Sequence, residues 1–478
     1  MIEVPFMFSG NVLTVHLDEG RVEESFLPDV LVEDRVGGAL LALEFYRLNR
    51  EGDPLVIATG PLTGGLVPTA SSSVLTARSP LTGGVVHASV TNHAGPELKY
   101  SGYDVIVVRG RSPHPVYLWV HDEQAELLDA SDLWGKDPTT VTNTIRHRQG
   151  DDRVQVLSAG PACVAGSLAS SLSVNHWAST DRAAVGALVA SKNLLAIAAR
   201  GMGELEPADI DGFGPAALGL IAHMRSYRPP EGYRWDGHRL DPAREAISQL
   251  VHRSRGCFFC SSSGRPYLML DDDPARMERS DREAPGVMVA DLLPLGDLTA
   301  AGMNGQAIGE VTRASYMLGL DPCRAASAVR RAGAIDLPTA RPVLEALARG
   351  EGAPTRGDGM ACWDLGDRTG AHQAFVGLGV FTPANPPQVP TEGVEGAYRL
   401  LILQGLFYIL GMCPAGAVGA GIDTPSIVPV VQAATGLNLS ANDLEALAHR
   451  LVAETLELGP APDATASPVE LELRREFA

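Results

Sequence analysis

Lysine is scarce in this 478-residue chain. Of its 38 basic residues only three are lysines, and they are Lys99, Lys136 and Lys192. Arginine supplies the positive charge elsewhere, and a planar guanidinium does not replace a compact ammonium at every site. We therefore expect these lysines to occupy positions with tight geometry; chance survival on the surface is the alternative interpretation.

Net positive charge is also lacking. The formal net charge of -19 excludes the broad basic face that binding to a phosphate backbone requires, so we expect no nucleic-acid partner. Residues 1–4 begin neither a basic segment nor an apolar run, which argues against a secretory signal. The longest apolar stretch, 400–422, contains glycines and a proline. It predicts a buried core helix followed by a loop, and hence a cytoplasmic protein without a membrane span.

Cysteine is infrequent as well. Six cysteines in a chain without a secretory signal predict thiols or metal ligands rather than disulfides. Cys257 and Cys260 have metal-ligand spacing, although packing as small hydrophobes is an open alternative. Three further cysteines fit no ligand pattern, and we expect them at core positions: Cys163, Cys323 and Cys362.

The pattern along the chain predicts an α+β fold. Its length indicates two or three domains. Alternation around 13–17 and the apolar runs 105–108 and 116–120 predict strands, whereas 192–198 predicts a helix. Helical patterns dominate from 206 onward, at 242–251, 341–349 and 443–458. We expect a β-rich base domain over 1–205 and two mainly helical domains over 206–350 and 351–478.

A short repeat lies in the β-rich part. Pro-Leu-Thr-Gly-Gly occurs at 61–65 and again at 80–84. The repeat predicts two equivalent turns at the ends of paired strands. Glycine pairs let backbone N–H groups approach an anion closely, although simple strand turns require no function.

Six phrases occur in order along the first 205 residues: TGPLTG at 59–64, SPLTG at 79–83, GPELK at 95–99, DLWGKD at 132–137, GPA at 160–162 and SKNLLAI at 191–197. All three lysines fall inside them. Together they resemble the N-terminal domain of the aldehyde ferredoxin oxidoreductases, the tungsten-pterin enzymes. The resemblance implies a β-rich base that carries a bis-pterin tungsten or molybdenum cofactor, two helical domains covering it, and a four-iron cluster nearby.

The resemblance also implies cluster ligands. Cys257 and Cys260 match the family's Cys-x2-Cys-x3-Cys segment, and Cys413 matches its last ligand. Gly264 stands in place of the third cysteine of that segment. Three thiolates can hold a cluster in which one iron is open or differently ligated.

The pterin-binding segments depart from the family. Tyr316 and Tyr408 stand where the family has aspartates, and Ala39 stands where it usually has arginine. A phenol is a weaker acceptor than a bidentate carboxylate, so the site is remodelled. We expect both tyrosines to face one another across a cavity. The resemblance implies these cofactor-binding residues: Ser79, Lys99, Arg182, Lys192, Asn193, Gly319 and Gly411.

Catalytic candidates follow from the same resemblance. His372 matches an active-site histidine that can polarise a carbonyl or move a proton, and a structural histidine is the alternative. Asp291 is the acidic residue nearest in the sequence to the position that the family's general-base carboxylate would occupy. Tyr316 and Tyr408 are candidate proton donors.

The implied function is oxidation of an aldehyde or related carbonyl compound, with electrons passing through the cluster to a ferredoxin-like carrier. Four basic residues flank the cysteine segment and either attract an acidic carrier or form a solvated face: His252, Arg253, Arg255 and Arg265. Assembly as a homo- or hetero-oligomer stays open. Two alternatives are a cofactor-depleted binding or scaffold subunit, and a non-redox iron–sulfur lyase with an open iron as Lewis acid.

Overall fold

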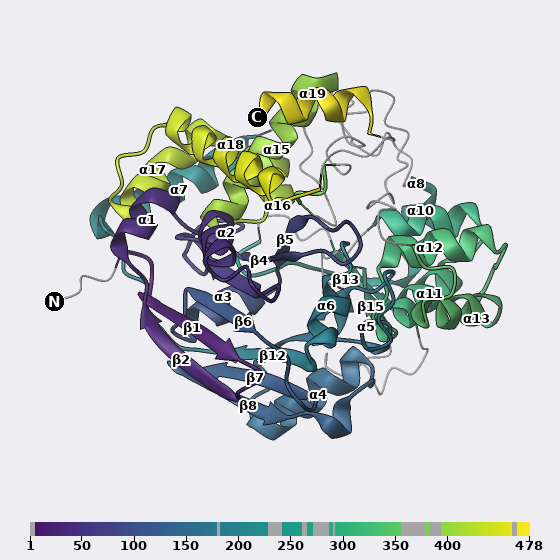
Figure 1. Ribbon diagram of the computed structural model, residues 1–478. Coiled ribbons are helices and arrows are strands. Elements are labelled where there is room, and N and C mark those ends of the chain that lie inside the picture. The colour runs from purple at the N-terminus through teal and green to yellow at the C-terminus, as the bar shows by residue number, and fades with distance from the viewer. Residues whose placement is uncertain are drawn as a thin grey trace.

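The computed structural model describes residues 5–178, 182–227, 241–260, 265–270, 286–289, 292–354, 378–381, 393–460 and 466–478. Strands dominate the first 200 residues, and helices dominate the rest (Figure 1). The predicted α+β class is therefore confirmed.

The first sheet, sheet A, has six strands in the order β2-β1-β6-β3-β4-β5. β1 and β6 run parallel, and the other neighbours are antiparallel. The strands are β1 (Asn11–His16), β2 (Arg21–Phe26), β3 (Leu55–Thr59), β4 (Ser73–Arg78), β5 (Val85–Val90) and β6 (Val105–Arg109).

The second sheet, sheet B, has the order β11-β10-β9-β12-β7-β8, and β7 and β12 are its parallel pair. Its strands are β7 (Val116–His121), β8 (Gln124–Asp129), β9 (Gln155–Ala159), β10 (Leu172–Val174), β11 (Trp177–Ala178) and β12 (Leu194–Arg200). Matching β1–β6 to β7, β8, β9, β10, β11 and β12 in turn reproduces every neighbour and direction. The two sheets therefore repeat one topology.

Helices occupy equivalent places in the two repeats. α2 (Gly38–Leu48) precedes β3 as α4 (Pro138–Gln149) precedes β9. Likewise α3 (Ala94–Tyr100) precedes β6 as α6 (Val185–Ser191) precedes β12. Two further α-helices lie in this part of the chain: α1 (Asp29–Arg35) and α5 (Pro161–Val164).

The helix predicted over 192–198 is wrong. α6 ends at Ser191, Asn193 adopts a left-handed φ of +56°, and β12 begins at Leu194. Residues 194–199 are buried between β7 and β9. A continuous apolar run in a strand buried on both faces has no alternation to distinguish it from a helix.

The helices form two groups. α10 (Leu293–Ala300), α11 (Gly305–Met317), α12 (Pro322–Arg331) and α13 (Leu337–Ala348) pack on one another at the right of Figure 1. The other group contains α7 (Ile210–Ser226), α15 (Gly393–Leu410), α16 (Pro414–Gly419), α17 (Thr424–Thr435), α18 (Ala441–Glu457) and α19 (Pro468–Glu476). Ser440 and Asp443 form a capping box at the start of α18, which satisfies backbone N–H groups there.

A small sheet precedes the first helical group, with strands β13 (Val251–Arg255), β14 (Arg265–Met269) and β15 (Gly286–Met288). α8 (Asp241–Ile247) comes before it, where the sequence predicted a helix over 242–251. The α-helix is shorter than predicted: it ends at Ile247, a 3-10 turn covers Ser248–Leu250, and β13 begins at Val251.

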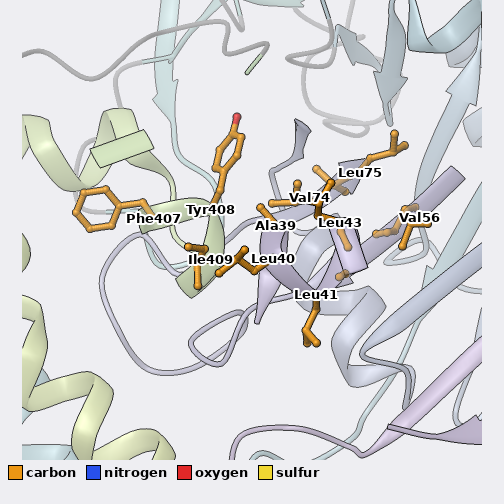
Figure 2. Packing of buried hydrophobic residues seen from close by; sticks show 14 of the residues in the cluster. Ala39, Leu40, Leu41, Leu43, Val56, Val74, Leu75, Phe407, Tyr408 and Ile409 are labelled. Atoms are coloured by element: carbon orange, nitrogen blue, oxygen red, sulfur yellow. The ribbon is translucent and has the colours of Figure 1, made fainter. Parts of the chain in front are cut away.

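The C-terminal half of α15 is the centre of the largest core. Its residues from Leu400 to Leu410 are buried, as predicted, and Ile409 packs toward Leu40 of α2 (Figure 2). A separate core contains α10, α11, α12 and α13. Within the described ranges, the helices include none whose length and apolar character suit a membrane span.

The two Pro-Leu-Thr-Gly-Gly turns are not equivalent, contrary to the expectation. β3 and β4 are antiparallel, with Thr59 beside Ser73. The first turn therefore follows β3 at one end of sheet A, whereas the second joins β4 to β5 at the other. Ser79 Oγ organises the second turn by accepting from Leu81 N and Thr82 N.

Candidate functional site

The C-terminal ends of α11 and α15 meet the two sheets at equivalent points. Gly319 follows α11 and lies against Gly160, just after β9; Gly411 follows α15 and lies against Gly60, just after β3. A Cβ on Gly160 would lie 2.8 Å from Gly319 Cα, and one on Gly60 would lie 2.3 Å from Gly411 N. Backbone meets backbone at both junctions, so only glycine fits.

The same two hydrogen bonds close each junction. In each case a backbone N–H of the sheet domain donates to a carbonyl at the helix end: Leu62 to Leu410 (3.0 Å) and Ala162 to Leu318 (2.8 Å), then Ser72 to Gly411 (3.1 Å) and Ser171 to Gly319 (2.9 Å). Tyr316 and Tyr408 each lie three residues before their glycine. They therefore occupy equivalent positions in the two halves.

Tyr408 is buried at the end of α15. Its ring meets Phe381 edge-on, with 5.5 Å between the ring centroids, and its hydroxyl points away from Ala39 and Leu40 (Figure 2). Burial, and secondarily Cys413, raises the pKa of Tyr408 far above its usual value. The side chain is thus a neutral phenol at neutral pH, able to donate a proton in a hydrogen bond.

Tyr316 is also buried but packs in the other core, with α10, α11, α12 and α13. Tyr316 interacts electrostatically with Arg265 and raises the pKa of that guanidinium, although by less than the three cysteines do. The cavity expected between Tyr316 and Tyr408 stays a prediction.

One residue of the base domain joins the two cysteine segments. Thr69 N donates to Phe259 O at 3.0 Å, and Thr69 O accepts from Cys413 N at 2.8 Å. Phe258 N donates to Asn92 O at 3.0 Å, which fixes the first segment a second time. Thr69 and Asn92 both have left-handed φ angles, of +66° and +64°. Segments 150 residues apart in sequence are thereby held at one place on sheet A.

The three predicted cysteine ligands interact electrostatically. Burial first, and then Cys257 and Cys260, raise the pKa of Cys413 to about 11. Arg265 opposes this shift, and its own pKa is raised, chiefly by Cys257. Arg265 Nη1 donates to Asn92 Oδ1 at 3.0 Å, and the same oxygen lies 3.7 Å from Cys257 Sγ. A guanidinium therefore faces three thiols.

No mononuclear site is formed by these groups. Across the part of the chain that the structure describes, no three His, Cys, Asp or Glu side chains are arranged to hold one metal ion. Thiolates beside a guanidinium suit an anionic iron–sulfur assembly in chemistry and charge, and a cluster held by these three cysteines stays a prediction.

Two of the three lysines are buried, as expected for tight geometry. Lys99 Nζ donates to Gly60 O at 2.6 Å and lies 4.3 Å from the centre of the Phe8 ring. Burial lowers the pKa of Lys99 to about 8, and Asp104 opposes the shift. Lys99 thus holds the turn that contacts Gly411, whereas Lys136 is exposed.

The other predicted cofactor residues make bonds within the base. Lys192 Nζ lies 3.2 Å from Gly52 O and 3.4 Å from Gly110 O, and its neighbour Asn193 donates to Ser112 O at 2.7 Å. These contacts tie α6 to the ends of both sheets. Their part in cofactor binding stays a prediction.

Ser79 and Arg182 lie close together in the fold. Ser79 Oγ donates to Ala183 O at 2.7 Å. Arg182 forms a buried ion pair with Asp321, with 3.4 Å between Nη1 and Oδ1. Asp321 also caps α12. Arg182 therefore links the base to the helices that follow Gly319.

Several predicted residues lie outside the described ranges: His372, Asp291, Gly264 and Cys362. Cys163 and Cys323 are buried, as expected. Sequence reasoning missed Thr69 and Asn92, since only their backbone contacts reveal their role.

Residues 12–201 match the family model described as aldehyde ferredoxin oxidoreductase, N-terminal domain. These residues therefore form a diverged N-terminal domain of the aldehyde ferredoxin oxidoreductase family. The tungsten-containing aldehyde ferredoxin oxidoreductase of Pyrococcus abyssi is 36% identical over 214 residues, which are 43% of this chain and 35% of that protein. An aliphatic sulfonate oxidoreductase, WOR-like subunit, of Pyrococcus furiosus is 29% identical over 223 residues, 42% of this chain and 35% of its own length. The matches thus span about a third of these relatives.

A solved structure resembles nearly the whole chain. The active-site complex BamBC of benzoyl coenzyme A reductase, in complex with 1,5-dienoyl-CoA, aligns with a TM-score of 0.75. The alignment covers 99% of this chain and 94% of that one, at 17% identity. The likeness shows that the two chains share one fold through both the β-rich and the helical parts.

The glycine junction can be tested by substitution. Gly319→Ala would place a Cβ 2.8 Å from Gly160 Cα at a φ of +68°, whereas Gly333→Ala has a φ of +69° with no heavy atom within 4 Å. We expect Gly333→Ala to cost about 1 kcal/mol of unfolding free energy from backbone strain. Gly319→Ala should cost at least about 2 kcal/mol more from the clash. Equal losses in urea unfolding would show that the junction is not tight.

Lys99 makes stability depend on pH. Its pKa of about 8 in the folded protein lies below the value of about 10.4 for free lysine, so the unfolded chain binds the proton more strongly between these values. The contribution of Lys99 to the free energy of unfolding therefore rises with pH between these two pKa values. Between about pH 7.5 and 9.5, wild type should gain roughly 2 kcal/mol relative to Lys99→Met. The exposed Lys136→Met should run parallel to wild type in the same denaturation series.

Proposed function

We propose that this protein is an oxidoreductase that acts on an aldehyde or related carbonyl compound and passes electrons through an iron–sulfur cluster. The observation that carries the proposal is the convergence of Cys257, Cys260 and Cys413 beside Arg265 at one place on sheet A. Tungsten-containing aldehyde ferredoxin oxidoreductases among the relatives support it.

The three cysteines would hold the cluster. Thiolates are the usual ligands of iron–sulfur clusters, and the assembly they form is anionic. Arg265 is a cation that is partly buried, and among the described residues no carboxylate pairs with it. Such a charge beside three thiols suits a bound anion. The cluster would supply one-electron transfer.

A tungsten or molybdenum pterin would lie against the two glycine junctions. Its part would be the two-electron exchange with the substrate carbonyl. The residues there differ from an aspartate pair, since Tyr316 and Tyr408 each offer a single hydroxyl. Binding through tyrosine hydroxyls and exposed backbone groups of the junctions is the arrangement that we propose.

The protein's own groups would position the substrate and move a proton. Tyr408 stays protonated because burial disfavours its anion, so it suits donation toward a developing oxyanion. Tyr316 is the equivalent donor in the other half. His372 and Asp291 remain the proposed histidine and general base.

The proposed partner is a small acidic electron carrier of the ferredoxin type. Arg253 and Arg255 lie on β13, beside the cysteine segment, and would contact it. Arg265 donates a hydrogen bond to Asn92, and in this position it suits an interaction with the cluster better than one with the carrier. We also propose oligomeric assembly, supported by the subunit and complex named among the relatives.

A binding subunit without the pterin is the second candidate. It is favoured by the replacement of both carboxylates by tyrosine at equivalent positions. In that case the cluster cysteines would serve structure or electron relay alone.

Cys413→Ser tests the cluster. Anaerobically purified wild type should be brown and contain iron, and Cys413→Ser should lose most of that iron because a third of the identified thiolates is gone. Cys323→Ser, a buried cysteine on α12, is the matched control and should keep its iron. Colourless wild type from a host competent in cluster assembly, or equal loss in both variants, would contradict the proposal.

Arg265→Gln tests the charge beside the cluster. Removing a unit charge several ångströms away should make the midpoint potential more negative by roughly 100 mV at an effective dielectric of about 20. Arg265→Lys retains the charge and should restore most of the potential. Redox titration followed by electron paramagnetic resonance measures both; identical potentials in the three proteins would remove Arg265 from the site.

A further inference from the structure

Thr69 combines two unfavourable features. It is a β-branched residue with a φ of +66°, a backbone conformation that such side chains rarely adopt without strain. Its side chain is buried, with 1% of the residue's surface exposed, and its Oγ1 has no hydrogen-bond partner. Nearly all buried hydroxyls in native proteins are paired, because one that leaves water without a new partner costs free energy. The hydroxyl therefore indicates a partner that is bound in the working protein.

The other half of the base domain makes the same backbone contact without a hydroxyl. Thr69 O accepts from Cys413 N at 2.8 Å, and Ala169 O accepts from Asp321 N at 2.8 Å. Cys413 and Asp321 each lie two residues after their junction glycine, so the two bonds are equivalent. Ala169 is buried and has no left-handed φ. The fold thus closes this contact with alanine, and it needs neither the hydroxyl nor the strain.

The cysteines distinguish the half that contains Thr69. Its backbone bonds both cysteine segments, because Thr69 N also donates to Phe259 O at 3.0 Å. A methyl group added to Gly416 would lie 3.0 Å from Thr69 Cγ2 and 3.7 Å from Cys413 Sγ. The Thr69 side chain and the Cys413 thiol are therefore both within van der Waals reach of one methyl group. The unpaired hydroxyl belongs to a side chain that packs among the predicted cluster ligands.

The neighbouring hydroxyl of Ser71 does not carry the same argument. Ser71 Oγ is also buried and unpartnered, but so is Ser170 Oγ in the other half. Each of these serines precedes the residue that donates to its junction glycine, Ser72 to Gly411 and Ser171 to Gly319. An unpaired serine at this point is common to both halves, so Ser71 supplies a control from the same loop.

The chemistry of the cysteine segments identifies the partner of Thr69. The sulfur atoms of an iron–sulfur cluster are anionic acceptors, and hydrogen bonds to them help to set its reduction potential. We propose that the Thr69 hydroxyl donates a hydrogen bond to a sulfur atom of the cluster held by the three predicted cysteine ligands. The bond strengthens as the cluster gains an electron, so it raises the reduction potential. This inference rests on the proposed function for the presence of the cluster and assigns a residue that tunes it.

Three variants of the full-length protein test this role. Thr69→Val removes the hydroxyl but keeps the β-branched shape, and Thr69→Ser keeps the hydroxyl but loses the methyl group. Ser71→Ala removes the other unpaired hydroxyl of the loop. Each protein is purified anaerobically, its iron is counted, and its cluster is titrated with electron paramagnetic resonance as the readout.

At the midpoint potential of the wild type, the ratio of reduced to oxidised cluster should fall roughly tenfold in Thr69→Val. For a one-electron couple this change corresponds to about 59 mV. Thr69→Ser and Ser71→Ala should stay within about twofold of the wild-type ratio. Electron–nuclear double resonance of the reduced cluster in D2O should show one fewer coupled deuteron in Thr69→Val than in Thr69→Ser, which a purely structural role would not produce.

The inference is wrong if iron-loaded Thr69→Val keeps the wild-type potential, if Ser71→Ala shifts it equally, or if Thr69→Ser behaves as Thr69→Val does. Iron loss is judged by the same comparison: loss in Thr69→Val alone supports the hydroxyl bond, and loss in Thr69→Ser as well contradicts it. Iron-loaded wild type whose potential is independent of Thr69 removes this inference and leaves the proposed function. Iron-free wild type removes both.

Discussion

Backbone-to-backbone contact at two glycine pairs sets the architecture of this molecule. Gly60 with Gly411, and Gly160 with Gly319, bring a helix end within touching distance of a strand end. The two tyrosines and Cys413 are all positioned by the register of α11 and α15 against these pairs. A side chain at any of the four positions would lift the helix end from its sheet and displace those groups together.

The sequence was most informative where the motifs that resemble the family lie at closely packed backbone segments. The phrases around Gly60, Gly160 and Lys99 identified the family, and the structure makes all three parts of the junctions. The α+β class and the core helix ending at Leu410 were also predictable, because long apolar or alternating patterns report burial directly. β12 was mistaken for a helix because a strand buried on both faces carries no alternation.

Repetition in sequence and repetition in structure differ in this chain. The two Pro-Leu-Thr-Gly-Gly phrases read as equivalent turns but lie at opposite ends of sheet A. The true repeat relates the two sheets and has almost no shared sequence beyond Gly-Pro after β3 and after β9. Strand pairing can keep one topology with many different side chains. A short motif such as Pro-Leu-Thr-Gly-Gly reflects instead the conformation that its own turn requires. Thr69 and Asn92 were unpredictable for the related reason that their backbone hydrogen bonds join segments far apart in the sequence and exist only in three dimensions.

The distance in sequence between the halves of each junction has a consequence for biosynthesis. Sheet A is complete by Arg109, yet the glycine that closes it, Gly411, emerges about 300 residues later. Contacts this far apart form late, because the loop between them must close first. During translation the face that bears Thr69 and Lys99 stays uncovered while the rest of the chain is made. A large prosthetic group of the kind proposed above would have free access to this face during that interval, and docking of α15 would then enclose it.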